Sequence, residues 1–176
     1  MFLDVSRMRE PLEHFERTCP GSTIDAGDDF AVQGEVALAF DVHKDRDRYR
    51  LVGAVRATLS LACSRCLEPY LVPVDVAFDL RYLPQTDNTG EDEREVREDD
   101  LTTAFYRHEV IDLGELAREQ FYLALPMKPL CREDCRGLCP TCGTNLNRDA
   151  CGCTGQWVDP RLEGLRALLR DREGKD

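Results

Sequence analysis

The sequence lacks the features that mark membrane-bound and secreted proteins. No apolar run approaches the roughly 20 residues that a membrane-spanning helix needs. The opening stretch MFLDVSRMREPLEHF meets a charged side chain at Asp4 and holds no apolar signal core. Together these absences predict a cytoplasmic protein that has no membrane partner.

Basic residues and histidine are also scarce. Lys and Arg number 23 against 34 Asp and Glu, which gives a formal net charge of −11. A protein this acidic is a poor candidate for clamping nucleic acid through phosphate contacts alone, whereas it suits a basic partner such as a ribosomal protein. The plainer alternative is that the acidity only confers solubility. The three histidines are scattered, so we expect other side chains to hold any bound metal.

Cysteine, by contrast, is abundant, with nine residues in a chain of 176. Eight of them form four closely spaced pairs: Cys63/Cys66, Cys131/Cys135, Cys139/Cys142 and Cys151/Cys153. An odd total in a protein expected in the reducing cytosol favours metal binding over disulfides. Eight thiolates make two closed, four-coordinate sites, which is the usual arrangement for structural zinc. We therefore predict two zinc ions per chain and a spare thiol at Cys19, within a turn-like TCPGS stretch.

The spacing of the pairs suggests how they combine. The last two pairs are close enough to complete one site within the segment CPTCGTNLNRDACGC. The pair in CSRC would then combine with the pair in CREDC, about seventy residues further along the chain. Two other partitions of the four pairs remain open.

Other uses of these sulfurs fit the sequence less well. The run CRGLCPTC has a spacing that can hold an iron–sulfur cluster, but radical chemistry of that kind normally sits on a much larger barrel. A thioredoxin-type function for CSRC would need a βαβ pattern around it, which is missing. A zinc deaminase would need an H-x-E element, and a hydrolytic zinc would need an open coordination position. The remaining alternative is a redox-responsive zinc-thiolate protein, which would need an exposed thiolate of low pKa.

The pattern of apolar residues predicts an α+β protein. It indicates an antiparallel β-sheet with one packed helix, a cysteine-rich segment that resembles a zinc ribbon, and a C-terminal helix. Strands are predicted over 30–42, 50–63, 71–83 and 105–112, and helices over 113–124 and 161–172. In the second strand the alternation puts Leu51, Val55, Leu59 and Leu61 on the buried face. Asp112 is the expected cap of the first helix.

The predicted elements divide the chain into two parts. We expect a mainly antiparallel β domain over residues 1–127, with an acidic loop over 84–100 that carries seven carboxylates in EDEREVREDD. A zinc-binding ribbon with the C-terminal helix packed on it should follow over residues 128–176. The first part holds 14 basic and 26 acidic side chains, whereas the second holds 9 and 8.

This order of elements resembles the YceD family, the large ribosomal RNA subunit accumulation proteins. The resemblance rests on CSRCLEPY and the long strand after it, on LALPMKPLCREDCRGLCPTCGTNLN, on CGC, and on the closing DPR with its leucine-rich helix. It covers roughly residues 50–170. It implies a non-enzymatic factor in ribosome biogenesis that supports accumulation of 23S ribosomal RNA, with no catalytic residues and no small-molecule substrate. Zinc would then support this function without carrying it out.

The expected partners are a large ribosomal subunit precursor and, within it, ribosomal RNA or a basic ribosomal protein. The candidate RNA-binding residues are the arginines of the cysteine-rich part: Arg132, Arg136, Arg148, Arg161 and Arg166. These arginines could equally pair with neighbouring carboxylates such as Glu133, Asp134 and Glu163.

Overall fold

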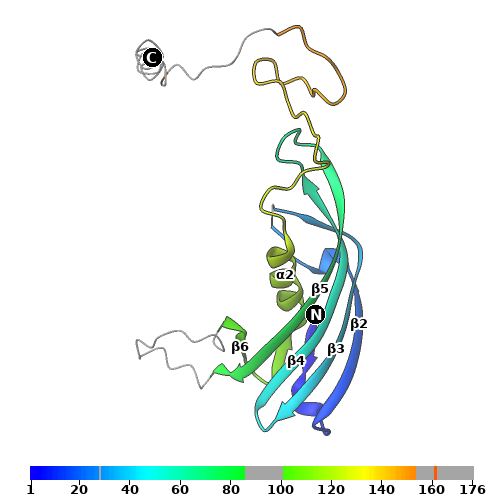
Figure 1. Cartoon of the computed structure of the whole chain (residues 1–176). Coiled ribbons are helices and arrows are strands. Elements are labelled where there is room, and N and C mark those ends of the chain that lie inside the picture. The colour runs from blue at the N-terminus through cyan, green and yellow to red at the C-terminus, as the bar shows by residue number, and fades with distance from the viewer. Residues whose placement is uncertain (28, 86–100, 154–160, 162–176) are drawn as a thin grey trace. The chain divides into compact units, whose positions relative to one another are not determined.

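A computed structural model describes residues 1–27, 29–85, 101–153 and 161 of the chain (Figure 1). The chain divides into two compact units, each of which is described by itself. The first unit is Met1–Ala62 with Pro69–Pro129, and the second is Cys63–Glu68 with Leu130–Asp176. Most of the predicted acidic loop over 84–100 and of the predicted helix over 161–172 lies outside the described residues. No helix within the described ranges is long and apolar enough to cross a membrane.

Five strands form the main sheet of the first unit, in the spatial order β2-β3-β4-β5-β6. Their bounds are Leu12–Pro20, Ala31–Asp45, Arg48–Ala62, Pro69–Pro84 and Thr103–Tyr106. The strands from β2 to β5 are antiparallel to their neighbours, whereas β6 lies parallel to β5. The sheet is therefore mixed, whereas the sequence analysis predicted an antiparallel sheet. The strands predicted over 30–42, 50–63 and 71–83 correspond to β3, β4 and β5.

The single strand predicted over 105–112 is wrong, because a tight turn divides it. His108 and Glu109 have φ angles of 53° and 57°, and the Val110 N–H donates to the Arg107 carbonyl at 3.0 Å. The chain therefore leaves β6 and reverses into β7 (Val110–Asp112), which pairs with β1 (Phe2–Asp4) in a separate two-stranded sheet. Short 3-10 turns at Val5–Arg7 and Gly21–Thr23 complete the N-terminal region.

The helix predicted over 113–124 is confirmed as α2 (Leu113–Ala124). The Asp112 carboxylate caps it by accepting hydrogen bonds from the backbone N–H groups of Gly114 at 2.8 Å and Glu115 at 3.2 Å. The helix ends where Leu125 becomes extended, immediately before Pro126, as expected for a residue that precedes proline. In Figure 1 the helix lies beside the sheet at β5.

The core lies on the face of the main sheet that α2 covers. The four residues predicted on the buried face of β4 are all buried, and they share one cluster with Leu113, Leu116 and Phe121 of the helix. Gly53 interrupts the apolar series, and Phe40 and Phe78 pack across it from the two neighbouring strands, with ring centroids 6.3 Å apart. A polar surface covers the opposite face of the sheet, where cross-strand ion pairs join Arg50 to Asp79 and Arg56 to Asp75.

The N-terminal strand β2 has no counterpart in the sequence predictions. It lies at the edge of the sheet and alternates mostly polar residues, so it has little of the apolar signal that marks a strand. Cys19 lies near its end and is buried in the core. The turn expected at TCPGS therefore begins only at Gly21.

Candidate metal centres

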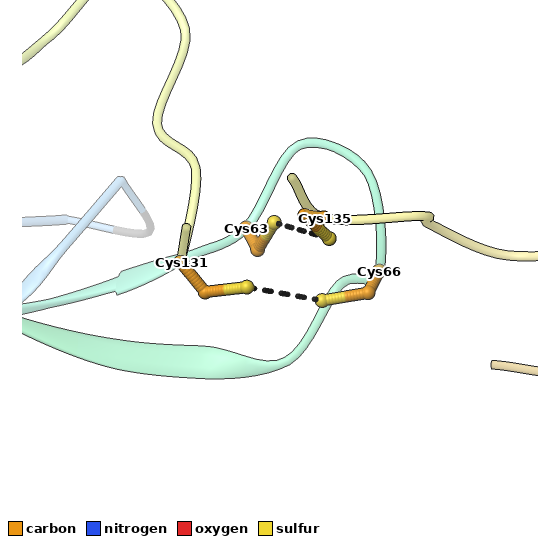
Figure 2. A group of neighbouring side chains, drawn as sticks. All are labelled: Cys63, Cys66, Cys131 and Cys135. Carbon is orange, nitrogen blue, oxygen red and sulfur yellow. Dashed lines mark hydrogen bonds between the residues drawn. The ribbon is translucent and has the colours of Figure 1, made fainter. Parts of the chain in front are cut away.

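The tip of the β4–β5 hairpin forms a tight loop that carries Cys63 and Cys66. The Leu67 N–H donates to the Cys63 carbonyl at 2.9 Å, and the Cys63 N–H donates to the Glu68 carbonyl, also at 2.9 Å. Leu67 adopts a left-handed conformation, with a φ of 61°. This backbone turns both cysteine sulfurs toward the same point, as Figure 2 shows.

The segment CPTCGT repeats the same loop further along the chain. The Gly143 N–H donates to the Cys139 carbonyl at 2.9 Å, and the Cys139 N–H donates to the Thr144 carbonyl at 2.8 Å. Gly143 has a φ of 74°, so the residue after the second cysteine is left-handed in both loops. Glycine adopts this conformation without steric cost, whereas leucine does not. We call these two loops the cysteine knuckles.

Four cysteines from distant parts of the sequence meet at the first knuckle. Cys63 and Cys66 face Cys131 and Cys135, and the four sulfurs lie within 4.8 Å of one another (Figure 2). The Cys63–Cys135 and Cys66–Cys131 sulfur distances are both 3.8 Å, and all four thiols are free. Cys63, Cys66 and Cys135 are buried. We call these four residues the first cysteine set.

The spacing of these sulfurs fits a tetrahedral metal ion. A disulfide has a sulfur–sulfur distance of about 2.05 Å, far shorter than the distances here. Four thiolates at about 2.3 Å from a central zinc ion would be about 3.8 Å from one another, which is the length of a tetrahedron edge. The first cysteine set therefore has the ligands and the dimensions to hold one metal ion.

Cys139, Cys142, Cys151 and Cys153 form the second cysteine set, with their sulfurs also within 4.8 Å of one another. This set is more open, because Cys142 and Cys153 are exposed and only Cys139 is buried. The Thr144 hydroxyl lies 3.2 Å from the Cys142 sulfur, within hydrogen-bonding distance. Each of the two sets could therefore hold an ion, and they differ in their access to solvent.

The electrostatics of both sets favour a bound cation. In the first set, burial opposes ionisation of Cys63, but the backbone N–H groups of Cys131, Cys66 and Arg65 outweigh it and lower the Cys63 pKa to about 6. Burial and the neighbouring sulfurs raise the pKa of Cys131 to about 12. Thiolates this close repel one another, so only some of the four ionise when no cation is present. A divalent cation would remove the repulsion and allow all four to bind as thiolates.

The second set has the same division. The backbone N–H groups of Cys142 and Thr141 lower the pKa of Cys139 to about 6. Its interaction with Cys142, followed by burial, raises the pKa of Cys153 to about 12. The second set therefore also combines a thiolate that forms readily with a thiol that loses its proton only when a metal cation binds to the sulfur.

The structure brings together the same two sets of four that the spacing favoured. It separates Cys135 from Cys139 and Cys142, because the first belongs to one set and the others to the second. The C-x3-C-x2-C run that could suit an iron–sulfur cluster therefore does not converge on one site. Cys19 lies in the first unit, within β2, and belongs to neither set.

Two residues that position the first set were missed by the sequence analysis. The Asn147 side-chain amide donates to the Cys135 sulfur at 3.3 Å, and its oxygen accepts from the Arg136 N–H and from Arg132 Nη2, both at 2.8 Å. Arg65 Nη1 donates to the Cys135 carbonyl at 2.9 Å. No spacing rule points to either residue, because each reaches its partner through the folded loop.

The candidate RNA-binding arginines have different surroundings. Arg148 pairs with Glu68 at 2.6 Å, and Arg132 lies 3.4 Å from Asp134. The exposed Arg136 guanidinium has no hydrogen-bond or ion-pair partner within the part of the chain that the structure describes. Arg161 is exposed, and Arg166 lies outside the described residues. Of the carboxylates expected to pair with these arginines, only Asp134 does so among the described residues.

Comparison with known families identifies relatives of this chain. A family model described as large ribosomal RNA subunit accumulation protein YceD matches residues 51–169. This span includes most of β4, all of β5 and all eight cysteines of the two sets. No solved structure matches the chain significantly.

Curated relatives come from plants and bacteria. The protein named large ribosomal RNA subunit accumulation protein YCED homolog 1, chloroplastic, of Zea mays is 30% identical over 157 residues, which cover 76% of this chain and 52% of the relative. The Arabidopsis thaliana protein of the same name is 27% identical over 165 residues, covering 79% and 51%. An uncharacterized protein of Mycobacterium tuberculosis is 36% identical over 122 residues, covering 68% and 55%. The chain thus spans about half the length of the curated relatives it matches.

Proposed function

The chain belongs to the YceD family of large ribosomal RNA subunit accumulation proteins, and on this basis we propose that it is a non-enzymatic factor in large ribosomal subunit biogenesis. It supports accumulation of 23S ribosomal RNA in the cytoplasm by binding a precursor of the large subunit. The observation that carries this proposal is the family match over residues 51–169. The two chloroplastic relatives, both named large ribosomal RNA subunit accumulation protein, support it.

Zinc is the metal that we propose for both cysteine sets. Four sulfur ligands without histidine or water are typical of closed structural zinc sites. Cys63, Cys66, Cys131 and Cys135 would hold one ion, and Cys139, Cys142, Cys151 and Cys153 the other. The ions would supply cross-links between loops that have little regular secondary structure, and four thiolates leave no coordination position for a substrate. This arrangement supports a binding protein over a zinc enzyme.

The contact with the ribosomal precursor can be made in two ways. Direct RNA contact would run through the arginines of the second unit, Arg136 foremost because its guanidinium has no partner within the described part. Such contact weakens as salt rises, because binding releases counterions from the RNA. Contact with a basic ribosomal protein would instead use carboxylates of the first unit.

Depletion of the protein tests the proposed function. Cells that lose it should show a lower ratio of large-subunit to small-subunit ribosomal RNA during unstressed growth. The ratio should be restored by the wild-type chain and by Cys19→Ser, which alters a cysteine outside both sets, but not by Cys63→Ser with Cys135→Ser. A normal ratio after depletion would contradict the proposal.

A second candidate function is a redox-responsive zinc-thiolate protein, which the exposure of the second set favours. Cys142 and Cys153 are exposed, and hydrogen bonds from Thr144 lower the pKa of Cys142. An exposed thiol with a lowered pKa is the kind that peroxide oxidises. Rapid zinc release by mild peroxide, together with a normal RNA ratio in depleted cells, would favour this second function over the first.

A further inference from the structure

The first unit contains a second feature that the cysteine sets do not explain. A cavity of about 480 Å³ opens between the end of β5, the β6–β7 region and the first turns of α2. Aromatic and acidic side chains line it: Phe2, Tyr82, Phe105, Asp112, Glu115 and Glu119. We propose that this cavity, which we call the acidic pocket, binds an arginine side chain of a basic partner protein.

The carboxylates of the acidic pocket follow one face of α2. Asp112 caps the helix, and Glu115 and Glu119 lie three and seven residues further on, on the same face. Glu115 is 3.6 Å from Arg118, whereas Glu119 has no ion-pair partner within the described part of the chain. Burial, together with the charge of Glu115, raises the pKa of Glu119. A cation at this position would therefore offset the cost of burying the Glu119 charge and its repulsion by Glu115.

Tyr82 gives an independent indication that the pocket can accept a polar group. Its side chain is only 6% exposed, yet its hydroxyl has no hydrogen-bond partner among the described residues. No polar side-chain atom in the described part is both sealed from solvent and unbonded, so this hydroxyl reaches solvent, and Tyr82 lines the acidic pocket. Burial and then the charges of Glu119, Glu115 and Asp112 raise the Tyr82 pKa, and all four residues line the same pocket. The described residues give this hydroxyl no partner, so its oxygen can accept a hydrogen bond from an N–H donor of a bound ligand.

The aromatic side chains favour a planar organic cation. Phe2 and Phe105 are exposed and line the pocket, and aromatic rings attract a guanidinium. A single metal ion does not fit, because only the two cysteine sets, among the described residues, have ligand atoms within 4.8 Å of one another. A guanidinium has five N–H donors spread over a plane, so it can reach a carboxylate and the Tyr82 hydroxyl together.

The charges around the pocket favour a protein over RNA. Arg107 and His108 also line it, but the Arg107 guanidinium already donates to the Gln85 side chain. The N-terminal ammonium lies 3.7 Å from Asp112, and Arg118 lies 3.6 Å from Glu115. Glu119 is therefore the one carboxylate of the three without an ion-pair partner among the described residues, and its charge would repel a phosphate. The proposal rests on the proposed function only in taking the partner to be a basic protein of the large ribosomal subunit.

Peptide titration of the full chain tests the acidic pocket. The probe is the blocked tripeptide acetyl-Gly-Arg-Gly-amide, and the control probe carries citrulline, which has the shape of arginine but no charge. NMR of the labelled protein should show saturable shifts of backbone amides within residues 104–119 with the arginine peptide. The citrulline peptide should produce no saturable shifts.

Three variants localise the binding. Glu119→Gln should weaken it by roughly 1.5-fold to 5-fold, which is the range for a partly exposed ion pair. Tyr82→Phe removes only a hydroxyl without a partner, so it should fold normally and bind more weakly. Glu16→Gln changes an exposed carboxylate on β2, away from the pocket, and should bind as the wild type does. The proposal would be overturned if Glu119→Gln and Tyr82→Phe bound the arginine peptide as tightly as the wild type does. It would also be overturned if the citrulline peptide bound as tightly as the arginine peptide.

The two proposals can fail separately. If the peptide binds in the pocket but depleted cells keep a normal ribosomal RNA ratio, the pocket would be an arginine site. Its partner would then not be a protein of the large ribosomal subunit. A lowered ratio without saturable peptide binding would leave the proposed function intact and reject the pocket.

Discussion

Asn147 shows how a single residue outside the cysteine sets can control a metal centre. Its amide nitrogen donates to the Cys135 sulfur, and its oxygen accepts from Arg132 and from the Arg136 backbone. A hydrogen bond to a sulfur ligand stabilises the thiolate and fixes its position. Asn147 therefore joins the first cysteine set to the loop around it.

The substitution Asn147→Asp should weaken zinc binding at the first set by about 10-fold to 100-fold. Aspartate keeps the accepting oxygen, but it loses the N–H donor and adds a negative charge beside the thiolates. Competition with a chromogenic chelator measures the affinity. Gln33→Glu adds the same charge to an exposed position of β3 and should leave the affinity unchanged. Equal affinities for Asn147→Asp and wild type would show that Asn147 does not support the site.

Cys19 should behave as a core residue and not as a ligand. Cys19→Ser should retain the full zinc content, and it should lower the free energy of unfolding by about 1–3 kcal/mol because it buries a hydroxyl. Burial raises the pKa of the Cys19 thiol, so a thiol reagent should modify it slowly in the folded protein. Elemental analysis and denaturant unfolding measure the two effects. Loss of an equivalent of zinc would show that Cys19 is a ligand.

The two knuckles share one backbone and differ in one residue. Leu67 occupies the left-handed position in the first knuckle, where the second knuckle has Gly143. A non-glycine residue in this conformation costs about 1–2 kcal/mol. Leu67 is 65% exposed, so it recovers little of that cost through burial.

Leu67→Gly should therefore tighten zinc binding at the first set, by roughly fivefold for about 1 kcal/mol. Gly143→Ala is the matched reverse change, because a Cβ there meets nothing within 4 Å and only the backbone strain is added. It should weaken the second set by a similar factor. Chelator competition on each variant measures both effects. Unchanged affinity in both variants would mean that the knuckle conformation does not limit metal binding.

Elements with a strong periodic pattern could be predicted from the sequence. β5 alternates regularly because one of its faces packs on the core, and two of the four cysteine pairs have the spacing of the knuckle loop. The edge strand β2 was missed because its polar residues give no such pattern. The β6–β7 turn was missed because its left-handed residues are His108 and Glu109, without the glycine, asparagine or aspartate that usually marks such a turn. Asn147 could not be found, because its contacts exist only in the folded loop.

Gly53 in β4 is a residue whose role depends on neighbouring strands. A Cβ at this position would lie 2.3 Å from the Ala39 carbonyl oxygen and 2.4 Å from the Phe40 Cβ. Gly53→Ala should lower the free energy of unfolding of the first unit by about 1–3 kcal/mol, the usual cost of overpacking. Urea unfolding measures it, with Ala37→Ser on the exposed face of β3 as a control. A variant as stable as the wild type would contradict this account of the core.

At the scale of the whole molecule, the chain combines two units with different stabilising forces. The first unit has an apolar core that β3, β4, β5 and α2 build together. Residues 63–68 and 130–153 of the second unit form no named strand or helix, and Leu138 and Asn145 form an isolated β-bridge. Its order therefore depends on the two cysteine sets, and bound zinc can supply about 10–16 kcal/mol of apparent folding energy in modules of this kind.

Native mass spectrometry of the intact protein, purified without added metal, tests this account most directly. The wild-type chain should carry two zinc ions. Cys135→Ser and Cys139→Ser should each carry one, because these residues belong to different sets. One ion or none in the wild-type chain, or iron with visible absorbance, would contradict the account.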